Sequence, residues 1–315
     1  MKAFLLRAPA KINLYLRVLG RRADGYHEIE TLFQRIDLAD EISFESHPSE
    51  LILTCSDPDL SCAEDNLIIK AACLLKAKTA TRQGASIHLT KRIPIAAGLG
   101  GGSSDAASTL LGLNELWELG LTRPTLIELA SQLGSDVPFF LCSSAFAIGR
   151  GRGQRCEEVS SKLRLIYVLV NPALALSTQQ VYEFAQFDLT QSKPSLSMVR
   201  HALANGSLDE LALGLWNDLE PEAIRRCPSS GILRTRLVRL GCLAAWVSGS
   251  GPTVIGLCRD LLQAQQIVHQ LQAAAVPTWR IEIAQTDARL LRLSHCVASC
   301  CSEKYRPPSP HHGVD

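Results

Sequence analysis

Apolar and polar residues alternate along the first part of the chain with the two-residue period of β-strands. Between Lys11 and Leu19, every second residue from Ile12 to Val18 is apolar, as expected of a half-buried strand. Further short strands are predicted at residues 29–36, 41–45, 51–54 and 86–89. The first third of the chain is therefore predicted to be rich in strands.

Helical patterns follow. The apolar run from Leu67 to Leu75 predicts a helix, and Asn66 can cap its first amide groups. Further helices are predicted at residues 106–119, 125–133 and 178–187, within 196–240 and at 261–274, with strands at 165–170, 244–247, 253–257 and 278–283. Strands interleaved with helices in two halves predict an α+β protein, with a boundary near residue 160 and a cleft shared by the halves.

A glycine-rich segment lies between a predicted strand and a predicted helix. Four of the five residues from Gly98 to Gly102 are glycine, which permits positive φ angles and close approach of amide groups to a ligand. Ser103, Ser104 and Asp105 then begin a helix, whose dipole favours phosphate, and the two hydroxyls suit phosphate oxygens or magnesium. The alternative is a flexible turn before a capped helix. The segment is not a P-loop, because no Gly-Lys-Ser/Thr closes it.

Two charged residues lie next to apolar segments. Asp136 follows Gly134 and precedes Val137 and Pro138, so it is either a surface turn residue or a general base that needs a cationic partner. Lys11, at the start of the first strand, is the candidate partner, which would keep the carboxylate ionised and stabilise a developing alkoxide. The alternative for Lys11 is a solvated charge at a strand end.

Composition narrows the class of protein. The 315 residues carry 32 Lys and Arg against 31 Asp and Glu, a net charge of +1, with 20% charged and 46% hydrophobic residues. These values are ordinary for a soluble globular protein and argue against wholesale disorder and a broad nucleic-acid footprint. No uncharged apolar run reaches about 18 residues. We therefore expect a cytoplasmic protein that binds neither membranes nor nucleic acid.

The cysteines point to a reducing compartment. There are eleven, with no CxxC pair, and we expect them to be free thiols. His295, Cys296, Cys300 and Cys301 lack the spacing and supporting fold of a zinc site, so no metal ligand is assigned to protein side chains. Residues 293–315 are predicted to be a disordered tail.

Three separate motifs resemble those of one enzyme family. Residues 9–13, 94–104 and 248–253 are similar to the three ordered motifs of the GHMP kinases, small-molecule kinases named for galactose, homoserine, mevalonate and phosphomevalonate. The resemblance covers about residues 3 to 285. It is strongest to the branch that phosphorylates 4-diphosphocytidyl-2-C-methyl-D-erythritol (CDP-methylerythritol), through residues 8–14, 22–27, 98–107, 135–139 and 217–220.

The resemblance implies a fold and a reaction. The fold would be an α+β, two-domain GHMP kinase fold, with residues 1–160 resembling domain 2 of ribosomal protein S5 and residues 161–292 ferredoxin-like. The reaction would be transfer of the γ-phosphoryl group of ATP, with Mg²⁺, to the 2-hydroxyl of CDP-methylerythritol, a step in non-mevalonate isoprenoid synthesis. The partners would be these two small molecules, and the protein a monomer or homodimer.

The resemblance also implies roles for individual residues. Lys11 and Asp136 would be catalytic. The substrate would contact Asn13, Tyr26, His27, Thr178 and Tyr182, with His27 at the edge of the cytosine and the two tyrosines on its faces. ATP would contact Asn66 and the residues Pro94, Ile95, Ala96, Ala97, Gly98, Leu99, Gly100, Gly101, Gly102, Ser103 and Ser104.

One departure and three alternatives remain. Ala96 stands where the family pattern has glycine, and it constrains the first turn of the loop. Tyr182 could instead be a core residue, since a tyrosine in an apolar helix usually is. The protein could also be a GHMP kinase for homoserine or mevalonate, although residues 22–27 favour a cytidine substrate. It could finally be a non-catalytic member that binds a nucleotide.

Overall fold

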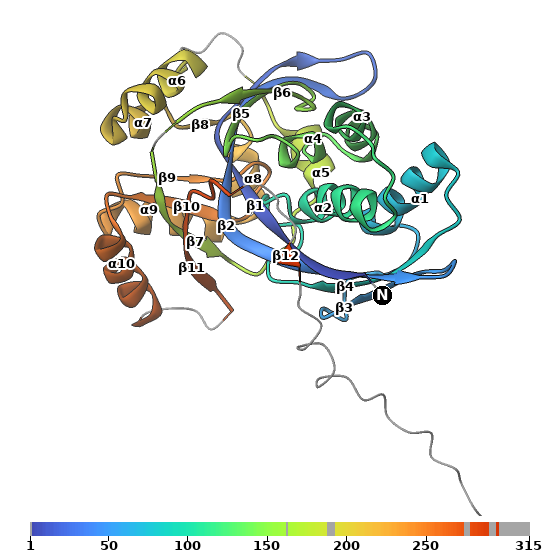
Figure 1. The fold of residues 1–315 in the computed structure, drawn as a ribbon. Coiled ribbons are helices and arrows are strands. Elements are labelled where there is room, and N and C mark those ends of the chain that lie inside the picture. Colours follow the sequence, from blue (N-terminus) through green and yellow to red (C-terminus); the bar gives the residue numbers. More distant parts are fainter. Residues whose placement is uncertain (1, 162, 188–192, 274–277, 290–293, 296–315) are drawn as a thin grey trace, which may run out of the picture.

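The computed structural model describes residues 2–161, 163–187, 193–273, 278–289 and 294–295 of the chain. These residues form two β-sheets with helices packed against them (Figure 1). None of the described helices is long and apolar enough to cross a membrane.

Two long antiparallel strands form the centre of the first sheet. They are β1 (Ala3–Arg21) and β2 (His27–His47). Six shorter described strands complete it: β3 (Leu51–Cys55), β4 (Gly84–Thr90), β5 (Phe146–Gly151), β6 (Arg155–Val159), β8 (Trp216–Asn217) and β12 (Ser294–His295). The last two belong to the second half of the chain and pair with β1.

Strand β2 is continuous where the hydrophobic pattern predicts two strands. Residues 29–34 pair with β5, and residues 41–47 pair with β4. Because different partners hold its two halves, the polar residues between them do not end the strand. Strands β5 and β6 lie where the pattern predicts no element. Gly149 and Gly151 interrupt the alternation in β5, and the adjacent charges Glu157 and Glu158 interrupt it in β6.

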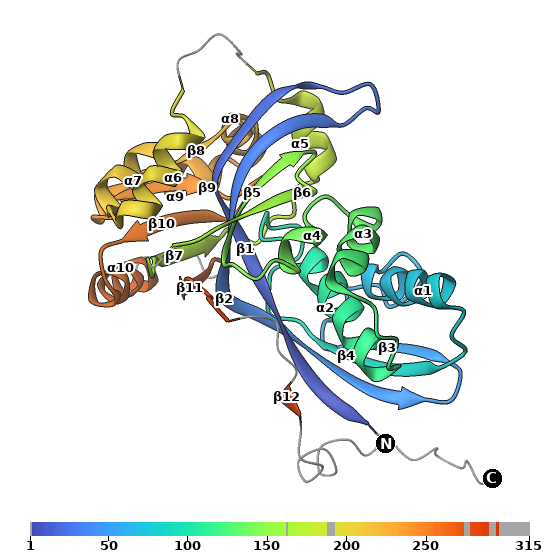
Figure 2. The same ribbon diagram turned by 45° about the horizontal axis from the view of Figure 1, so that its top comes forward.

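Four helices cover one face of the first sheet (Figure 2). They are α1 (Leu67–Thr79), α2 (Gly101–Leu116), α3 (Arg123–Leu133) and α4 (Val137–Phe140). Leu110 and Leu113 of α2 are fully buried in a core shared with Phe44 and Ile87 of the sheet. Burial of each such side chain contributes about 1.5–3 kcal/mol, so α2 is held by its apolar face.

Two predictions about these helices have different outcomes. Asn66 caps α1 as predicted, because its Oδ1 accepts a hydrogen bond from the amide of Ile68. Helix α2, however, begins at Gly101 rather than at Ala106, so part of the predicted loop is helical. Glycine costs about 1 kcal/mol in a helix, and the buried apolar face of α2 outweighs that cost.

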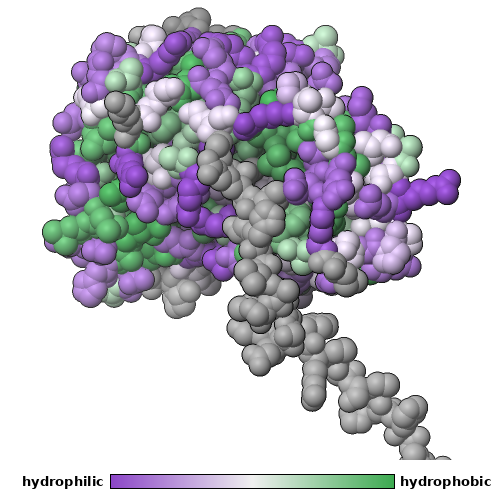
Figure 3. All heavy atoms as spheres, viewed as in Figure 1, coloured by the Kyte–Doolittle hydropathy of each residue, from purple (hydrophilic) through white to green (hydrophobic). Residues whose placement is uncertain are grey.

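The second sheet has the topology expected of a ferredoxin-like unit. Its described strands are antiparallel in the order β11 (Arg280–Gln285), β7 (Ile166–Asn171), β10 (Val254–Cys258) and β9 (Ala244–Val247). The helices of this half are α5 (Thr178–Phe184), α6 (Leu196–Asn205), α7 (Leu208–Gly214), α8 (Glu220–Arg226), α9 (Pro228–Arg239) and α10 (Leu261–Ala273). Figure 3 shows hydrophobic side chains gathered on the surface over α10, where Leu261 and Leu262 are exposed.

The two sheets share a core. Tyr167 and Leu169 of β7 pack with Ile12 and Leu14 of β1, while Val168, on the opposite face of β7, packs with residues of α9 and α10. Because successive side chains of β7 point to opposite faces of the sheet, one face packs on α9 and α10 and the other packs on β1.

The predicted division at residues 160 and 292 remains a proposal. Consecutive strands of the first sheet end at Val159 and the second sheet begins at Ile166, but β8 and β12 return to the first sheet. Ser294 and His295, placed in the predicted tail, pair with Leu5 and Phe4. Cys296, Cys300 and Cys301 lie outside the described residues.

Candidate active site

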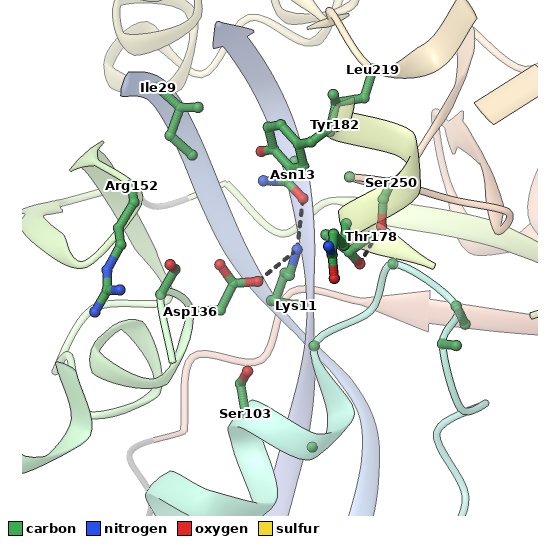
Figure 4. A pocket seen from close by; sticks show the side chains of 18 of the residues that line it. Lys11, Asn13, Ile29, Ser103, Asp136, Arg152, Thr178, Tyr182, Leu219 and Ser250 are labelled. Atoms are coloured by element: carbon green, nitrogen blue, oxygen red, sulfur yellow. Dashed lines mark hydrogen bonds and ion pairs between the residues drawn. The ribbon is translucent and has the colours of Figure 1, made fainter. Parts of the chain in front are cut away.

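A cavity of about 1370 Å³ lies where the three sequence motifs meet (Figure 4). Most of the residues singled out from the sequence line it: Lys11, Asn13, Tyr26, His27, Asn66, Pro94, Ile95, Ala96, Ala97, Gly98, Gly100, Gly101, Gly102, Ser103, Asp136, Thr178 and Tyr182. Two do not. Leu99 and Ser104 are buried beside the cavity, so only one of the two predicted hydroxyls, that of Ser103, reaches it.

Lys11 is a buried cation. Its Nζ lies 2.8 Å from Oδ1 of Asn13 and 3.2 Å from Oδ2 of Asp136, and the residue is only 5% exposed. Its backbone amide donates to the carbonyl of Leu99, 2.9 Å away, which ties β1 to the glycine loop. The alternative of a solvated charge at a strand end is therefore wrong.

Asn13 is itself held in a defined orientation. Its Nδ2 donates to the hydroxyl of Thr31 (2.8 Å), which donates in turn to the carbonyl of Tyr15 (2.6 Å). Because the amide nitrogen is engaged in this way, the amide oxygen faces Lys11.

Asp136 precedes the short helix α4 but does not cap it through its side chain. The carboxylate instead pairs with Lys11 and is 28% exposed. Figure 4 shows both side chains directed toward the same part of the cavity. A half-buried carboxylate beside a buried ammonium can accept a proton from a ligand, which a simple surface turn residue is not positioned to do.

The glycine loop is shaped by its approach to other motifs. Gly98 and Gly100 have φ angles of 76° and 69°, in the left-handed region that favours glycine. A Cβ at Gly98 would lie 2.1 Å from the carbonyl oxygen of Ser248, and one at Gly100 would lie 2.9 Å from Cγ of Lys11. These glycines are needed for contact with protein atoms.

Ala96 also has a left-handed backbone, with φ of 51°. This conformation costs an L-residue other than glycine about 1–2 kcal/mol. The sequence predicts that alanine in place of glycine constrains the first turn of the loop, and in the structure Ala96 is a strained residue at that turn.

The start of α2 offers unpaired amide groups to the cavity. The first hydrogen bond of the helix runs from the amide of Ser104 to the carbonyl of Gly100 (2.9 Å), so the amides of Gly101, Gly102 and Ser103 precede it. All three residues line the cavity. Free amides and the positive end of the helix dipole make this a place for an anion.

The third motif, residues 248–253, is joined to other parts of the site by hydrogen bonds. The Ser248 hydroxyl donates to the carbonyl of Gly98 (3.0 Å), and the hydroxyls of Ser250 and Thr178 lie 2.8 Å apart. Asn217 donates to the carbonyl of Gly249 (2.7 Å). The loop from Ser248 to Pro252 therefore joins the glycine loop, α5 and the segment before α8.

Aromatic residues line the other end of the cavity. The rings of His27 and Tyr182 are stacked, with centroids 5.2 Å apart. Tyr26 is 52% exposed, and the guanidinium of Arg152 lies 4.9 Å from its ring centroid. Burial, with a smaller effect of Arg21, lowers the pKa of His27. The lowered pKa favours the neutral imidazole, which has one nitrogen as donor and one as acceptor.

Tyr182 is both a core residue and a cavity residue. It lines the cavity, packs against the core around Val181, and has its pKa raised by burial. Tyr182 is stacked on His27, while Tyr26 faces the guanidinium of Arg152.

Sequence reasoning missed several cavity residues. Arg152, Ser250, Lys91 and Asp105 line the cavity but have no assigned role in the sequence analysis. Asp105 directly follows the two motif serines, and Lys91 lies three residues before Pro94. The short distance in sequence between these two residues and the glycine loop is the feature that could have identified them.

The chain is similar to known proteins of one family. Residues 66–144 match the family model described as GHMP kinases N terminal domain, and residues 199–277 match GHMP kinases C terminal. A protein of Pelotomaculum thermopropionicum named 4-diphosphocytidyl-2-C-methyl-D-erythritol kinase is 44% identical over 261 residues, which are 82% of this chain and 91% of that protein. A protein of the same name from Enterococcus faecalis is 41% identical over 84% of this chain and 94% of its own length.

Solved structures show the same likeness. A crystal structure of 4-(cytidine 5'-diphospho)-2C-methyl-D-erythritol kinase is 35% identical, with a TM-score of 0.76 over 90% of this chain and 99% of that one. A homoserine kinase from Cytophaga hutchinsonii shares the fold, with a TM-score of 0.72 at 16% identity over 93% of this chain and 98% of that one. The chain therefore belongs to the GHMP kinase family, in the branch of the 4-diphosphocytidyl-2-C-methyl-D-erythritol kinases.

Proposed function

We propose that the protein transfers the γ-phosphoryl group of ATP to the 2-hydroxyl of CDP-methylerythritol. The observation that carries this proposal is the ion pair of Lys11 and Asp136. The pair lines one cavity together with the amide-rich start of α2 and the aromatic group around His27. A phosphate donor and a cytidine-linked acceptor therefore both have a matching surface beside the pair.

In the nucleotide half, the amides of Gly101, Gly102 and Ser103 bind the phosphates of ATP. The residues Pro94, Ile95, Ala96, Ala97, Gly98 and Gly100 form the wall of this half, with Leu99 buried behind them. Asn66 contacts the nucleotide while it caps α1. The helix dipole of α2 supports the same anion.

In the acceptor half, the cytosine binds between Tyr26 and Tyr182, with His27 hydrogen-bonded to its edge. Tyr182 exchanges its stack on His27 for a stack on the base. Asn13 and Thr178 contact the remainder of the acceptor, because both line the cavity close to Lys11 and Ser250.

Catalysis rests on positioning and charge. The acceptor oxygen forms a bond to the γ-phosphorus as the bond from this phosphorus to the leaving ADP oxygen breaks. Asp136 takes the hydroxyl proton, and the ammonium of Lys11, held by Asn13, stabilises the negative charge on the attacking oxygen. A tertiary hydroxyl is a hindered nucleophile, so activation by such a pair is chemically useful.

Few protein side chains in the nucleotide half could bind Mg²⁺. Among the described residues there is no group of three or more His, Cys, Asp or Glu that could hold a metal, whereas the Ser103 hydroxyl lines the cavity beside the free amides. We propose that the Ser103 hydroxyl would be the protein ligand of Mg²⁺, which would neutralise phosphate charge when bound with ATP.

Three further proposals concern the setting of the reaction. The protein acts on small molecules alone, without nucleic acid or membrane, and is a monomer or a homodimer. It works in the cytoplasm, which agrees with the free thiols of its described cysteines.

The test is an ADP-release assay with ATP and one of four acceptors: CDP-methylerythritol, homoserine, mevalonate or galactose. We expect turnover with the first alone. Turnover with homoserine or mevalonate would support a different GHMP kinase activity, and binding of ATP without turnover of any acceptor would support a non-catalytic member.

A further inference from the structure

A buried ionic cluster lies under the first turns of α2, apart from the pair of Lys11 and Asp136. The cluster consists of Asp40 in β2, Lys91 after β4 and Asp105 in α2. Nζ of Lys91 forms ion pairs with Oδ2 of Asp40 and, at 3.2 Å, with Oδ2 of Asp105. The three side chains are 0%, 6% and 4% exposed in that order, so one buried ammonium joins three elements of the fold.

The cluster holds the chain at both ends of the glycine loop. Oδ1 of Asp40 accepts hydrogen bonds from the amides of Arg92 (2.5 Å) and Ile93 (2.8 Å), just before Pro94. Asp105 lies just after the loop, in the second turn of α2. Lys91 therefore connects the segment that enters the loop to the helix that leaves it.

Gly101 leaves the space that Lys91 needs. A Cβ at Gly101 would lie 2.8 Å from Nζ of Lys91 and 3.1 Å from Cγ2 of Ile93. Gly101, the first residue of α2, therefore lies directly against the ammonium of Lys91. Movement of Lys91 would change the position of the amides of Gly101, Gly102 and Ser103.

The cluster sets two carboxyl groups against one ammonium. Oδ1 of Asp105 has no hydrogen-bond partner among the described residues, although the residue lines the cavity. Burial, reinforced by Asp40 and opposed by Lys91, raises the pKa of Asp105 to about 8. Buried ion pairs of this kind contribute little net stability, since desolvation offsets their attraction.

We propose that Asp40, Lys91 and Asp105 are positioning residues that align the phosphate-binding amides at the start of α2. The inference rests on the proposed function, because it assigns ATP to this end of the cavity. It predicts that damage to the cluster weakens ATP binding and leaves the cytidine end, more distant and built from other elements, unchanged.

The test compares Asp105→Ala with Asp105→Asn. We measure the affinity for a non-hydrolysable ATP analogue and for CDP-methylerythritol by calorimetry, and KM for each substrate in turnover. Asp105→Ala removes the contact to Lys91 and is expected to weaken the ATP analogue at least about tenfold, or ~1.4 kcal/mol. Asp105→Asn keeps an oxygen that accepts from Lys91 and is expected to restore most of the affinity. Affinity and KM for CDP-methylerythritol stay the same in both variants.

A matched control is the buried pair of Lys193 and Asp218, joined at 2.7 Å with side chains 3% and 2% exposed. Asp218→Ala removes an equally buried partner of a lysine away from the glycine loop. It is expected to lower the melting temperature without a selective change in ATP affinity. If Asp105→Ala does not fold, Asp40→Asn makes the same test, since its amide nitrogen would face the ammonium of Lys91.

The proposal is overturned if Asp105→Ala binds the ATP analogue like the parent. It is also overturned if both ligands weaken equally, or if Asp105→Asn is as weak as Asp105→Ala. Failure of the proposed function is a separate result, seen as absence of ADP release by the parent protein with CDP-methylerythritol, and the calorimetric comparison does not depend on it.

Discussion

The Nζ atom of Lys11 lies 3.2 Å from Oδ2 of Asp136, although one residue is in the first strand and the other precedes α4. The register of β1 against β2 shifts between Pro9 and Lys11, immediately before the residue that makes this contact. A second tie, from the amide of Lys11 to the carbonyl of Leu99, places the same residue against the glycine loop. Lys11 thus contacts both Asp136 and the glycine loop.

Asp136→Asn is expected to keep the fold and ATP binding but to lose turnover. The amide retains the shape of the carboxylate but cannot take a proton, and loss of a general base typically lowers the rate by about 100- to 10,000-fold. The measurement is kcat from ADP release, with circular dichroism of each variant. Asp209→Asn, at an exposed aspartate of α7, is the control and should keep parental turnover. Near-normal kcat for Asp136→Asn would remove Asp136 from the mechanism.

His27→Ala is expected to raise KM for CDP-methylerythritol and to leave KM for ATP unchanged. The substitution removes the ring on which Tyr182 stacks and the proposed hydrogen bond to the base, and loss of a buried hydrogen bond costs about 1–3 kcal/mol. Steady-state kinetics with each substrate varied in turn measures the effect. An increase confined to the KM for ATP would place His27 at the wrong end of the cavity.

Gly101→Ala and Gly102→Ala are expected to differ, although the residues are neighbours in one helix turn. A Cβ at Gly101 would enter the space of Lys91 and Ile93, so the substitution would disturb protein packing under the helix. A Cβ at Gly102 meets only Cδ1 of Leu67, at 3.6 Å, and alanine favours the helix by up to about 1 kcal/mol. Thermal unfolding should show a lower melting temperature for the first variant and an equal or higher one for the second. Equal melting temperatures below the parent would contradict this account.

Ala96→Gly is expected to stabilise the protein slightly. Relief of the left-handed conformation gains about 1–2 kcal/mol, and the added freedom of glycine in the unfolded chain takes back about 0.4–1 kcal/mol. Urea unfolding measures the net effect. Ala97→Gly, at a buried neighbour outside the positive φ region, should instead destabilise. A loss of stability in both variants would show that Ala96 is not strained.

The free energy of unfolding of the parent, relative to that of Asp105→Asn, is expected to decrease as the pH rises. The raised pKa of Asp105, about 8 in the folded protein against 3.8 as the ordinary value, means that the folded chain holds a proton which the unfolded chain releases. The stabilisation linked to this proton is therefore full below pH 4, declines as pH rises and is lost above about pH 8. Urea unfolding of both proteins at pH 5, 7 and 9 measures it. A constant difference between them over this range would contradict the shift.

The sequence by itself indicated which residues could form the site. Lys11, Asp136 and the glycine loop were predicted because their chemistry is local: glycine permits the loop conformation, hydroxyls follow it, and a carboxylate stands among apolar residues. The α+β class, the cap at Asn66 and strand β9 likewise follow from neighbouring residues, whose periodicity and capping groups act over a few positions.

Only the tertiary structure decided what depends on distant partners. The continuity of β2 comes from its pairing with both β4 and β5, and the early start of α2 from the core that its apolar face enters. The ion pairs of Lys91 with Asp40 and Asp105, like the stack of Tyr182 on His27, join segments far apart in the chain. Such contacts are set by strand register and by the burial of whole surfaces, and no spacing along the chain encodes them.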